Sequence, residues 1–297
     1  MLRTTRAGLA SAFKDLTGAF VPVALRELDR ELRERLAKVP TPLNEYGYDR
    51  FGFSPEAARK AFLPAALFYR HYFRVETYGI EKIPSGRALL VGNHAGQLPF
   101  DAVMLGTACL LGAEPPRVLR SVAEFWIPRI PWFGVLVSRG GGLVGTPENC
   151  AAMLEAGECV LMFPEGARGM NKPYSERYKL QRFGPGFMRL ALATHTPVVP
   201  VALIGSEEQQ PGFTNLHKLG KLFGFSSLPV TLGFPWLGPL GILPLPVKYR
   251  FYFGDPLQFE GDAHDEDAAI EARVDTVKAK IVELLEHGRR ARRGVFF

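Results

Sequence analysis

The sequence predicts an α/β fold: a mixed β-sheet flanked by helices, with an N-terminal helical segment before it. Short apolar runs bounded by turn residues recur after residue 74, and helical stretches separate several of them. The chain of 297 residues, 47% hydrophobic and 22% charged, is also long enough to bury a sizeable core. We therefore expect an N-terminal helical segment, residues 1–73, and an α/β domain, residues 74–297, that ends in a helix and a basic tail.

The N-terminal segment is predicted to contain two helices. Four leucines recur at spacings of three and four among charged residues, which is typical of an amphipathic helix. They are Leu25, Leu28, Leu32 and Leu36. This stripe is expected to pack on the rest of the protein, and a helix lying at a membrane interface is the alternative. A second helix is predicted from the N-cap Ser54 and Pro55 to about Phe73.

Seven short apolar runs are predicted to be strands. They are RVETYGI (74–80), RALLVGN (87–93), RVLRSV (117–122), GVLVS (134–138), ECVLMF (158–163), PVVPVALIG (197–205) and VKYRFYFG (247–254). A last helix is predicted from about Glu266 to His287. The basic run RRARR, residues 289–293, is expected to be a solvated tail, with contact to anionic lipid headgroups as the alternative.

Charge and cysteine content narrow the class of protein. Thirty-six Lys and Arg against thirty Asp and Glu give a net charge of +6, which suggests an anionic partner such as a membrane surface, a nucleic acid or a phosphorylated substrate. The three cysteines have no CxxC spacing, so neither a disulfide framework nor a zinc site is expected. Charged residues interrupt any secretory signal pattern at the amino terminus, and the reducing cytosol is the expected compartment.

Residues 222–247 contain no ionisable side chain. Hydropathy alone would suggest a membrane span, but five prolines interrupt the segment and argue against a spanning helix, because lipid cannot satisfy the backbone groups that they leave unpaired. Two interpretations stay open. The segment is either an apolar loop that lies on a bilayer or lines an acyl pocket, or a hydrophobic loop packed on its own domain.

The stretch GNHAGQLPFD, residues 92–101, is the first candidate site. His94 follows a predicted buried strand directly, where a side chain can meet a substrate. A carboxylate at Asp101 that accepts from one ring nitrogen would fix the tautomer and leave the other nitrogen as a general base. The alternative for Asp101 is an N-cap of the helix that follows, and the two roles can coexist.

Two further stretches carry candidate ligands. FPEGARG, residues 163–169, places Arg168 on a strand-end turn where its guanidinium can bind a phosphate, and a surface salt bridge with Glu165 is the alternative. WFGVLVSRGGGLVG, residues 132–145, is expected to end a strand at Arg139. Its glycines also satisfy GxGxxG, but the next helix is predicted to begin after them at Thr146, so a dinucleotide site is not favoured.

These stretches occur in one order before HTPVVPVALIG (195–205), and together they resemble the PlsC-like glycerolipid acyltransferases, over about residues 74–254. The resemblance implies that the catalytic residues are His94 and Asp101. It also implies a set of residues that bind a phosphorylated acceptor, namely Asn93, Arg139, Glu165, Gly166 and Arg168, and a supporting block at Val199, Pro200 and Val201. One departure is clear, because six residues separate the histidine from the aspartate where the family has four.

The resemblance implies transfer of a fatty acyl group from acyl-CoA or acyl carrier protein to the free hydroxyl of a lysophospholipid such as 1-acylglycerol-3-phosphate. It implies a peripheral location at the cytoplasmic face of a membrane. No cofactor, metal ion or nucleic-acid partner is expected. Two alternatives are a neutral acceptor such as monoacylglycerol and a lipid-binding protein without turnover. No GxSxG, P-loop or HExxH pattern supports serine, nucleotide or metalloprotease chemistry.

Overall fold

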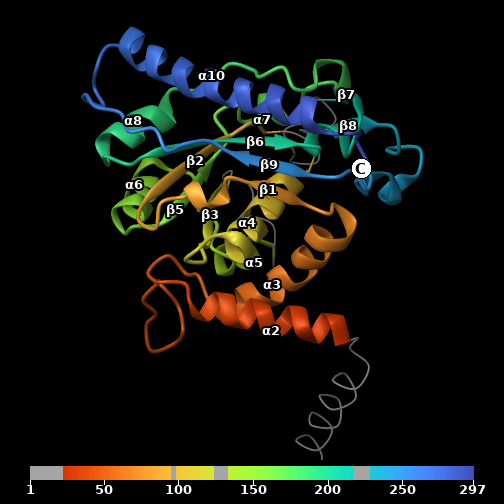
Figure 1. Cartoon of the computed structure of the whole chain (residues 1–297), viewed down its shortest axis with the longest axis horizontal. Helices are drawn as coiled ribbons and strands as arrows, with labels where there is room; N and C mark the ends of the chain where they lie inside the picture. The colour runs from red at the N-terminus through yellow and green to blue at the C-terminus, as the bar shows by residue number, and fades with distance from the viewer. Residues whose placement is uncertain (1–22, 95–97, 124–132, 217–227) are drawn as a thin grey trace, which may run out of the picture.

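A seven-stranded, mostly parallel β-sheet organises the chain (Figure 1). The computed structural model describes residues 23–94, 98–123, 133–216 and 228–297. The strands are β1 (Glu76–Tyr78), β2 (Ala88–Gly92), β3 (Leu119–Ala123), β4 (Leu143–Val144), β5 (Cys159–Met162), β6 (Val198–Ile204) and β9 (Arg250–Phe253), with a separate hairpin of β7 (Gly212–Leu216) and β8 (Leu228–Thr231). The large sheet has the order β1-β9-β6-β2-β5-β3-β4. Its described strand pairs are parallel except β6 and β9.

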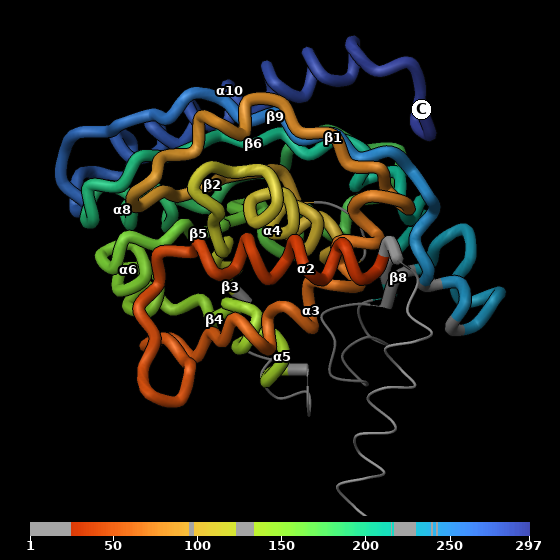
Figure 2. Tube along the Cα trace, turned by 60° about the horizontal axis from the view of Figure 1, so that its bottom comes forward, coloured from red at the N-terminus to blue at the C-terminus, as the bar shows by residue number. Residues whose placement is uncertain are grey.

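Helices cover both faces of this sheet (Figures 1 and 2). The α-helices are α2 (Val23–Ala37), α3 (Pro55–Leu67), α4 (Phe100–Gly112), α5 (Phe133–Arg139), α6 (Pro147–Glu155), α7 (Ala167–Met170), α8 (Gly186–Ala193) and α10 (Asp267–Ala291). Short helices of other types are η1 (Phe68–Tyr72), η2 (Ile80–Lys82), η4 (Tyr174–Glu176), η5 (Ser206–Glu208) and η6 (Gly238–Ile242). Helices α6, α8 and α10 pack on one face, and α4 lies on the other. The predicted mixed sheet flanked by helices is confirmed.

The strands are apolar because both faces of the sheet are covered. Every residue of β2 and β6 is buried, as expected for the centre of a sheet between two helical layers, and the residues of β9, which runs antiparallel to β6, are buried as well. The core on one side contains the stripe of α10, which includes Ile270, Val277 and Ile281. Full burial of such a side chain contributes roughly 1.5–3 kcal/mol.

The leucine stripe of α2 packs on protein, as predicted. Leu28, Leu32 and Leu36 are buried in a cluster with residues of α3 and α4. The second predicted helix is also confirmed, because α3 begins after Ser54 with Pro55 and the π-helix η1 continues to Tyr72. Residues 1–22 of the predicted N-terminal segment lie outside the described residues.

One predicted strand is wrong. GVLVS, residues 134–138, belongs to helix α5, which ends at Arg139. A short apolar run does not by itself distinguish a strand from a buried helical turn. The glycines that follow act as the stop signal of a helix, since Gly141 has a φ of 104° and the Gly142 amide donates to the Val137 carbonyl.

The uncharged segment does not form a long helix in its described part. Residues 228–247 contain β8, turns and the short helix η6. Across the described ranges, every helix lacks either the length or the apolar character of a segment that crosses a bilayer.

Candidate active site

The carboxyl ends of three neighbouring strands form one edge of the sheet. Strands β5, β2 and β6 are parallel and adjacent, with Val91 paired to Met162 and Gly92 to Val201. His94 therefore lies two residues beyond β2, and Phe163 and Glu165 lie just beyond β5, at the same edge. Loops at this edge are where α/β sheets bind ligands.

His94 and Asp101 form a buried pair at this edge. The Nδ1 atom of His94 lies 2.7 Å from Oδ2 of Asp101, and Asp101 is completely buried. The imidazole stacks flat on the Phe163 ring, with centroids 4.1 Å apart and an interplanar angle of 1°. These contacts fix the ring, and within the described residues Nε2 has no hydrogen-bond partner. With the residue only 8% exposed, Nε2 is the ring atom left for a substrate proton.

The longer spacing between the two residues still brings them together. Helix α4 begins at Phe100 after Pro99, which occupies the N-cap position, and Asp101 lies in the first turn. Oδ1 of Asp101 accepts from the Ala102 amide at 2.8 Å, while Oδ2 faces His94. The predicted N-cap role is therefore wrong by position, because the helix starts two residues earlier than an aspartate cap would require.

Glu165 is buried beside the His94–Asp101 pair. One carboxylate oxygen accepts from the His94 amide at 3.0 Å, and the other accepts from the Gln181 amide at 2.7 Å. Lys172 lies 3.4 Å from the second oxygen, and Glu165 is 1% exposed. Both oxygens of Glu165 therefore hold other segments of the chain in this structure, and its predicted contact with substrate stays a prediction.

Asn93 also serves the scaffold. Its side-chain amide donates to the Leu203 carbonyl at 3.0 Å and its oxygen accepts from the Leu203 amide at 2.8 Å. The residue is fully buried between β2 and β6, and its predicted contact with substrate stays a prediction. The Val199, Pro200 and Val201 block forms the buried middle of β6 beside β2, in agreement with a supporting role.

Two glycines shape the turn after β5. Gly166 has a φ of 57° and a ψ of −148°, a conformation that side-chain-bearing residues rarely adopt. Gly169 packs so closely that a Cβ there would lie 2.7 Å from the His94 carbonyl oxygen. The turn therefore carries Arg168 to the outside of the site, where it is exposed and donates to the Arg182 carbonyl at 3.1 Å. Within the described chain, the ion pair of Glu165 is with Lys172 and not with Arg168.

Arg139 is not joined to this cluster by any contact in the described chain. Its guanidinium stacks on Tyr48, 4.0 Å from the ring centroid, and donates to the Gly52 carbonyl at 3.2 Å. It ends helix α5 rather than a strand, and it ties that helix to the loop before α3. Its proposed phosphate contact therefore remains a prediction that requires the guanidinium to leave Tyr48.

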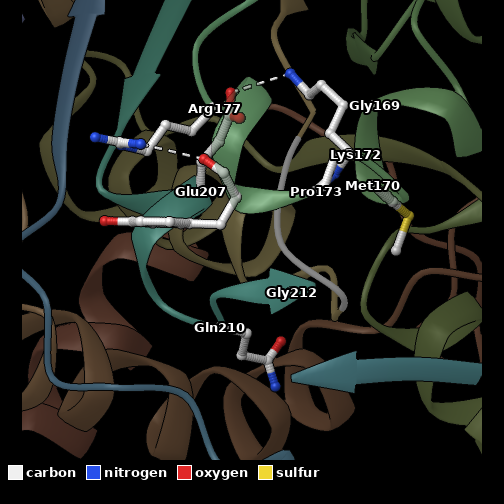
Figure 3. Close-up of a pocket in the computed structure, with 9 residues that line it drawn as sticks. Gly169, Met170, Lys172, Pro173, Arg177, Glu207, Gln210 and Gly212 are labelled. Carbon is white, nitrogen blue, oxygen red and sulfur yellow. Dashed lines mark hydrogen bonds and ion pairs between the residues drawn. The ribbon is translucent and has the colours of Figure 1, made fainter. Parts of the chain in front are cut away.

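A second group of buried charges lies behind Glu165. Lys172 bridges Glu165 and Glu207, whose Oε1 atom is 3.1 Å from Nζ, and Nζ also donates to the Lys179 carbonyl at 3.2 Å. Lys172 and Glu207 line a small polar cavity together with Gly169, Met170 and Gly212 (Figure 3). The volume of this cavity is about 10 Å³. A volume of that size holds about one water molecule.

Glu207 gives the stability of this region a defined pH dependence. Burial raises the pKa of Glu207 from its ordinary value of 4.5 to about 7, against the opposing effect of Lys172. Between these two values the native state keeps a proton that the unfolded chain has lost, so this residue's contribution to stability falls as pH rises. The difference in unfolding free energy between the native sequence and Glu207→Gln should decline from about pH 4.5 to about 7 and then level off. Denaturant titrations across this range would measure it, and parallel curves would contradict it.

The basic tail is not fully solvated, which corrects the prediction. Helix α10 continues to Ala291, so Arg289 and Arg290 are helical. Arg292 forms a bidentate ion pair with buried Glu208, at 2.5 and 2.7 Å. Glu208 also accepts from the Tyr178 hydroxyl at 2.9 Å, and the C-terminal end of α10 is thereby fastened to the end of β6.

Sequence reasoning missed Lys172 and Glu207 as parts of the site, and it did not predict that Phe163 stacks on the imidazole. The polar run SEEQQ, residues 206–210, follows a buried strand as abruptly as His94 does, and it would have indicated that β6 ends at the same edge. No comparable signal marks Lys172, because its partners are distant in sequence.

Comparisons with known proteins agree with this architecture. A family model described as Acyltransferase matches residues 74–204. An uncharacterized protein of Mycobacterium leprae is 39% identical over 273 residues, which cover 90% of this chain and 72% of the relative. The chain belongs to the acyltransferase family. The matched residues of this acyltransferase include the His94, Arg139 and Arg168 stretches and end with β6.

Two other similarities are more distant. The crystal structure of the 1-acyl-sn-glycerophosphate (LPA) acyltransferase PlsC from Thermotoga maritima has a TM-score of 0.52 and 18% sequence identity, and the match covers 80% of this chain and 83% of that one. This likeness concerns the fold. A mouse protein named DGAT1/2-independent enzyme synthesizing storage lipids is 28% identical over 200 residues, which are 65% of this acyltransferase and 56% of the mouse protein.

Proposed function

We propose that this protein transfers a fatty acyl group from acyl-CoA or acyl carrier protein to the free hydroxyl of a lysophospholipid such as 1-acylglycerol-3-phosphate. The observation that carries the proposal is the His94–Asp101 pair, which fixes the imidazole through Nδ1 and leaves Nε2 without a partner in the described chain. A histidine held in this way is a suitable general base for an alcohol.

The reaction is a direct displacement. Nε2 of His94 takes the proton of the acceptor hydroxyl as its oxygen attacks the thioester carbonyl, and a carbon–oxygen bond forms. The carbon–sulfur bond then breaks, and the thiolate leaves with the proton from the imidazolium. Asp101 stabilises the imidazolium while it exists, because its buried carboxylate lies 2.7 Å from Nδ1.

An exposed guanidinium beside the base is suited to an acceptor phosphate. Arg168 stands three residues from Glu165, on the turn that packs against His94, and it is exposed. We expect Arg168→Ala to raise the KM for 1-acylglycerol-3-phosphate by about tenfold, since a charged hydrogen bond of roughly 1.5 kcal/mol is lost, with little change in kcat. Arg182→Ala is the matched control, because that arginine is also exposed and pairs with Glu271. An unchanged KM would remove the proposed role.

A neutral acceptor such as monoacylglycerol is the second candidate. It is favoured by the similarity to the storage-lipid enzymes and by the histidine–aspartate spacing of this chain. Release of free CoA thiol, measured with each acceptor offered separately, distinguishes the two candidates. Turnover with monoacylglycerol and none with the phosphorylated acceptor would overturn the lysophospholipid proposal, and vesicle binding with no thiol release would indicate a lipid-binding protein without turnover.

We further propose that the protein works as a peripheral protein at the cytoplasmic face of a membrane. Its lipid acceptor would reside there, and the net charge of +6 favours an anionic surface. The division into an N-terminal helical segment, residues 1–73, and an acyltransferase domain, residues 74–297, is likewise proposed.

A further inference from the structure

Exposed apolar side chains gather on residues 228–247, here called the apolar lobe. Five of them are between 62% and 74% exposed, namely Leu232, Trp236, Leu237, Leu240 and Leu243. The lobe contains no ionisable residue. These side chains are not packed on their own domain, which corrects one of the two interpretations left open for this segment. Exposed apolar groups of this density mark an interaction surface.

The base of the lobe contacts the loop of the candidate active site. The Leu245 amide donates to the Gln209 carbonyl at 2.6 Å. The Gln209 side chain in turn donates to the carbonyl of Leu98, at 3.2 Å, in the loop between His94 and Asp101. A surface that receives the lobe would therefore lie close to the edge of the sheet where the imidazole is fixed.

The C-terminus adds aromatic groups beside the lobe. The Arg74 guanidinium donates to the carbonyls of Pro246, at 2.8 Å, and Phe296, at 3.1 Å, so the lobe and the chain end meet on one cation. The side chains of Phe296 and Phe297 are exposed. Figures 1 and 2 both show the segment after β8 on the side of the molecule where the C-terminus lies.

We infer that the apolar lobe docks the protein on the surface of a bilayer that contains anionic lipid, an inference that rests on the proposed function because the acceptor is a bilayer lipid. Burying the lobe requires no charge to be desolvated, and Trp236 is the residue type that prefers the membrane interface. Exposed Arg290 and Arg293, next to the chain end, are suited to anionic headgroups. A protein partner would instead be expected to meet a polar rim.

The first test follows Trp236 itself. A variant with Trp126→Phe and Trp132→Phe keeps Trp236 as its only tryptophan. We expect its emission to shift to the blue on vesicles of phosphatidylcholine with phosphatidylglycerol, and to be quenched when the acyl chains carry bromine. Binding without quenching would place the lobe outside the bilayer and overturn the inference.

The second test removes the apolar contact. Leu237→Ser with Leu240→Ser should weaken co-sedimentation with the same vesicles at least about tenfold, since two exposed leucines leave the lipid. Leu43→Ser with Val282→Ser is the matched control, because both side chains are exposed on other elements, and it should bind like the native chain. Vesicle binding by the lobe variant equal to that of the native chain would overturn the inference. So would a native protein that is a dimer and a lobe variant that is a monomer with undiminished vesicle binding, because the lobe would then contact another occupant.

Failure of the docking surface and failure of the proposed function give different results. If only docking is lost, the lobe variant should keep native turnover of a short-chain, water-soluble lysophospholipid and lose turnover of an acceptor embedded in vesicles. If the native chain turns over neither acceptor, the proposed function fails, while tryptophan quenching still reports whether the lobe enters the bilayer.

Discussion

His94→Ala is expected to lower the rate of acyl transfer by about 10³- to 10⁴-fold, because the only group that we place on the proton of the attacking hydroxyl is lost. Binding of donor and acceptor should be largely retained, so the loss should be seen in kcat. The measurement is release of free CoA thiol at saturating donor, with enzyme concentrations high enough to detect the residual rate.

The fold should survive this substitution. The backbone amide of His94 still donates to Glu165, and only the stack on Phe163 and the bond to Asp101 are removed. Near-UV circular dichroism and the unfolding midpoint check this. A native rate in a folded His94→Ala protein would show that another group acts as the base.

Asp101→Asn tests the role of the carboxylate that orients the His94 imidazole, while the imidazole itself stays in place. An amide nitrogen facing Nδ1 would move the ring proton to Nε2, where it blocks the base, and we expect a loss of about 10²-fold. The loss should be smaller than that of His94→Ala, since a fraction of the rings would keep the productive tautomer. An unchanged rate would indicate that the 2.7 Å contact serves the fold alone.

Much of the sheet and of its active edge could be predicted from the sequence. Strands such as β2 and β6 are unbroken apolar runs because helices cover both of their faces, and His94 and Glu165 follow such runs without a packing reason. Parallel neighbours end at the same edge, so two polar interruptions after two buried strands indicate one site. Local chemistry also fixed the start of α6, where the Thr146 hydroxyl accepts from the Asn149 amide at 3.1 Å.

The parts that could not be predicted depend on distant partners. Nothing near Arg139 in the sequence indicates that its guanidinium stacks on Tyr48, and nothing near Arg292 indicates Glu208. Asn93 and Glu165 were expected to meet substrate, yet their oxygens are taken by backbone amides of Leu203 and Gln181. A motif identifies residues that a site requires, while only the fold distinguishes those that touch substrate from those that hold the others in place.

Lys172→Met should lower the stability of the protein, because Lys172 holds other residues of the site in place. The Lys172 side chain is 3% exposed and lies within 3.4 Å of two buried carboxylates, Glu165 and Glu207. At about pH 8, above the raised pKa of Glu207, removing the ammonium leaves both carboxylates without their cation, and breaking a buried pair in this way costs about 3–5 kcal/mol of unfolding free energy. Guanidinium unfolding measures this cost, and Lys179→Met is the matched control, because that exposed lysine should change stability by less than about 0.5 kcal/mol.

A second variant tests whether charge is the cause. Adding Glu207→Gln to Lys172→Met removes one of the two carboxylates left behind, and it should recover part of the lost stability, whereas a purely steric effect of methionine would not be relieved. The wild-type lysine also steadies Glu165, which accepts from the His94 amide, so folded Lys172→Met should have a lower kcat with little change in acceptor KM. A Lys172→Met protein as stable as Lys179→Met would contradict the argument, because it would mean that the two buried carboxyl groups need no cation between them.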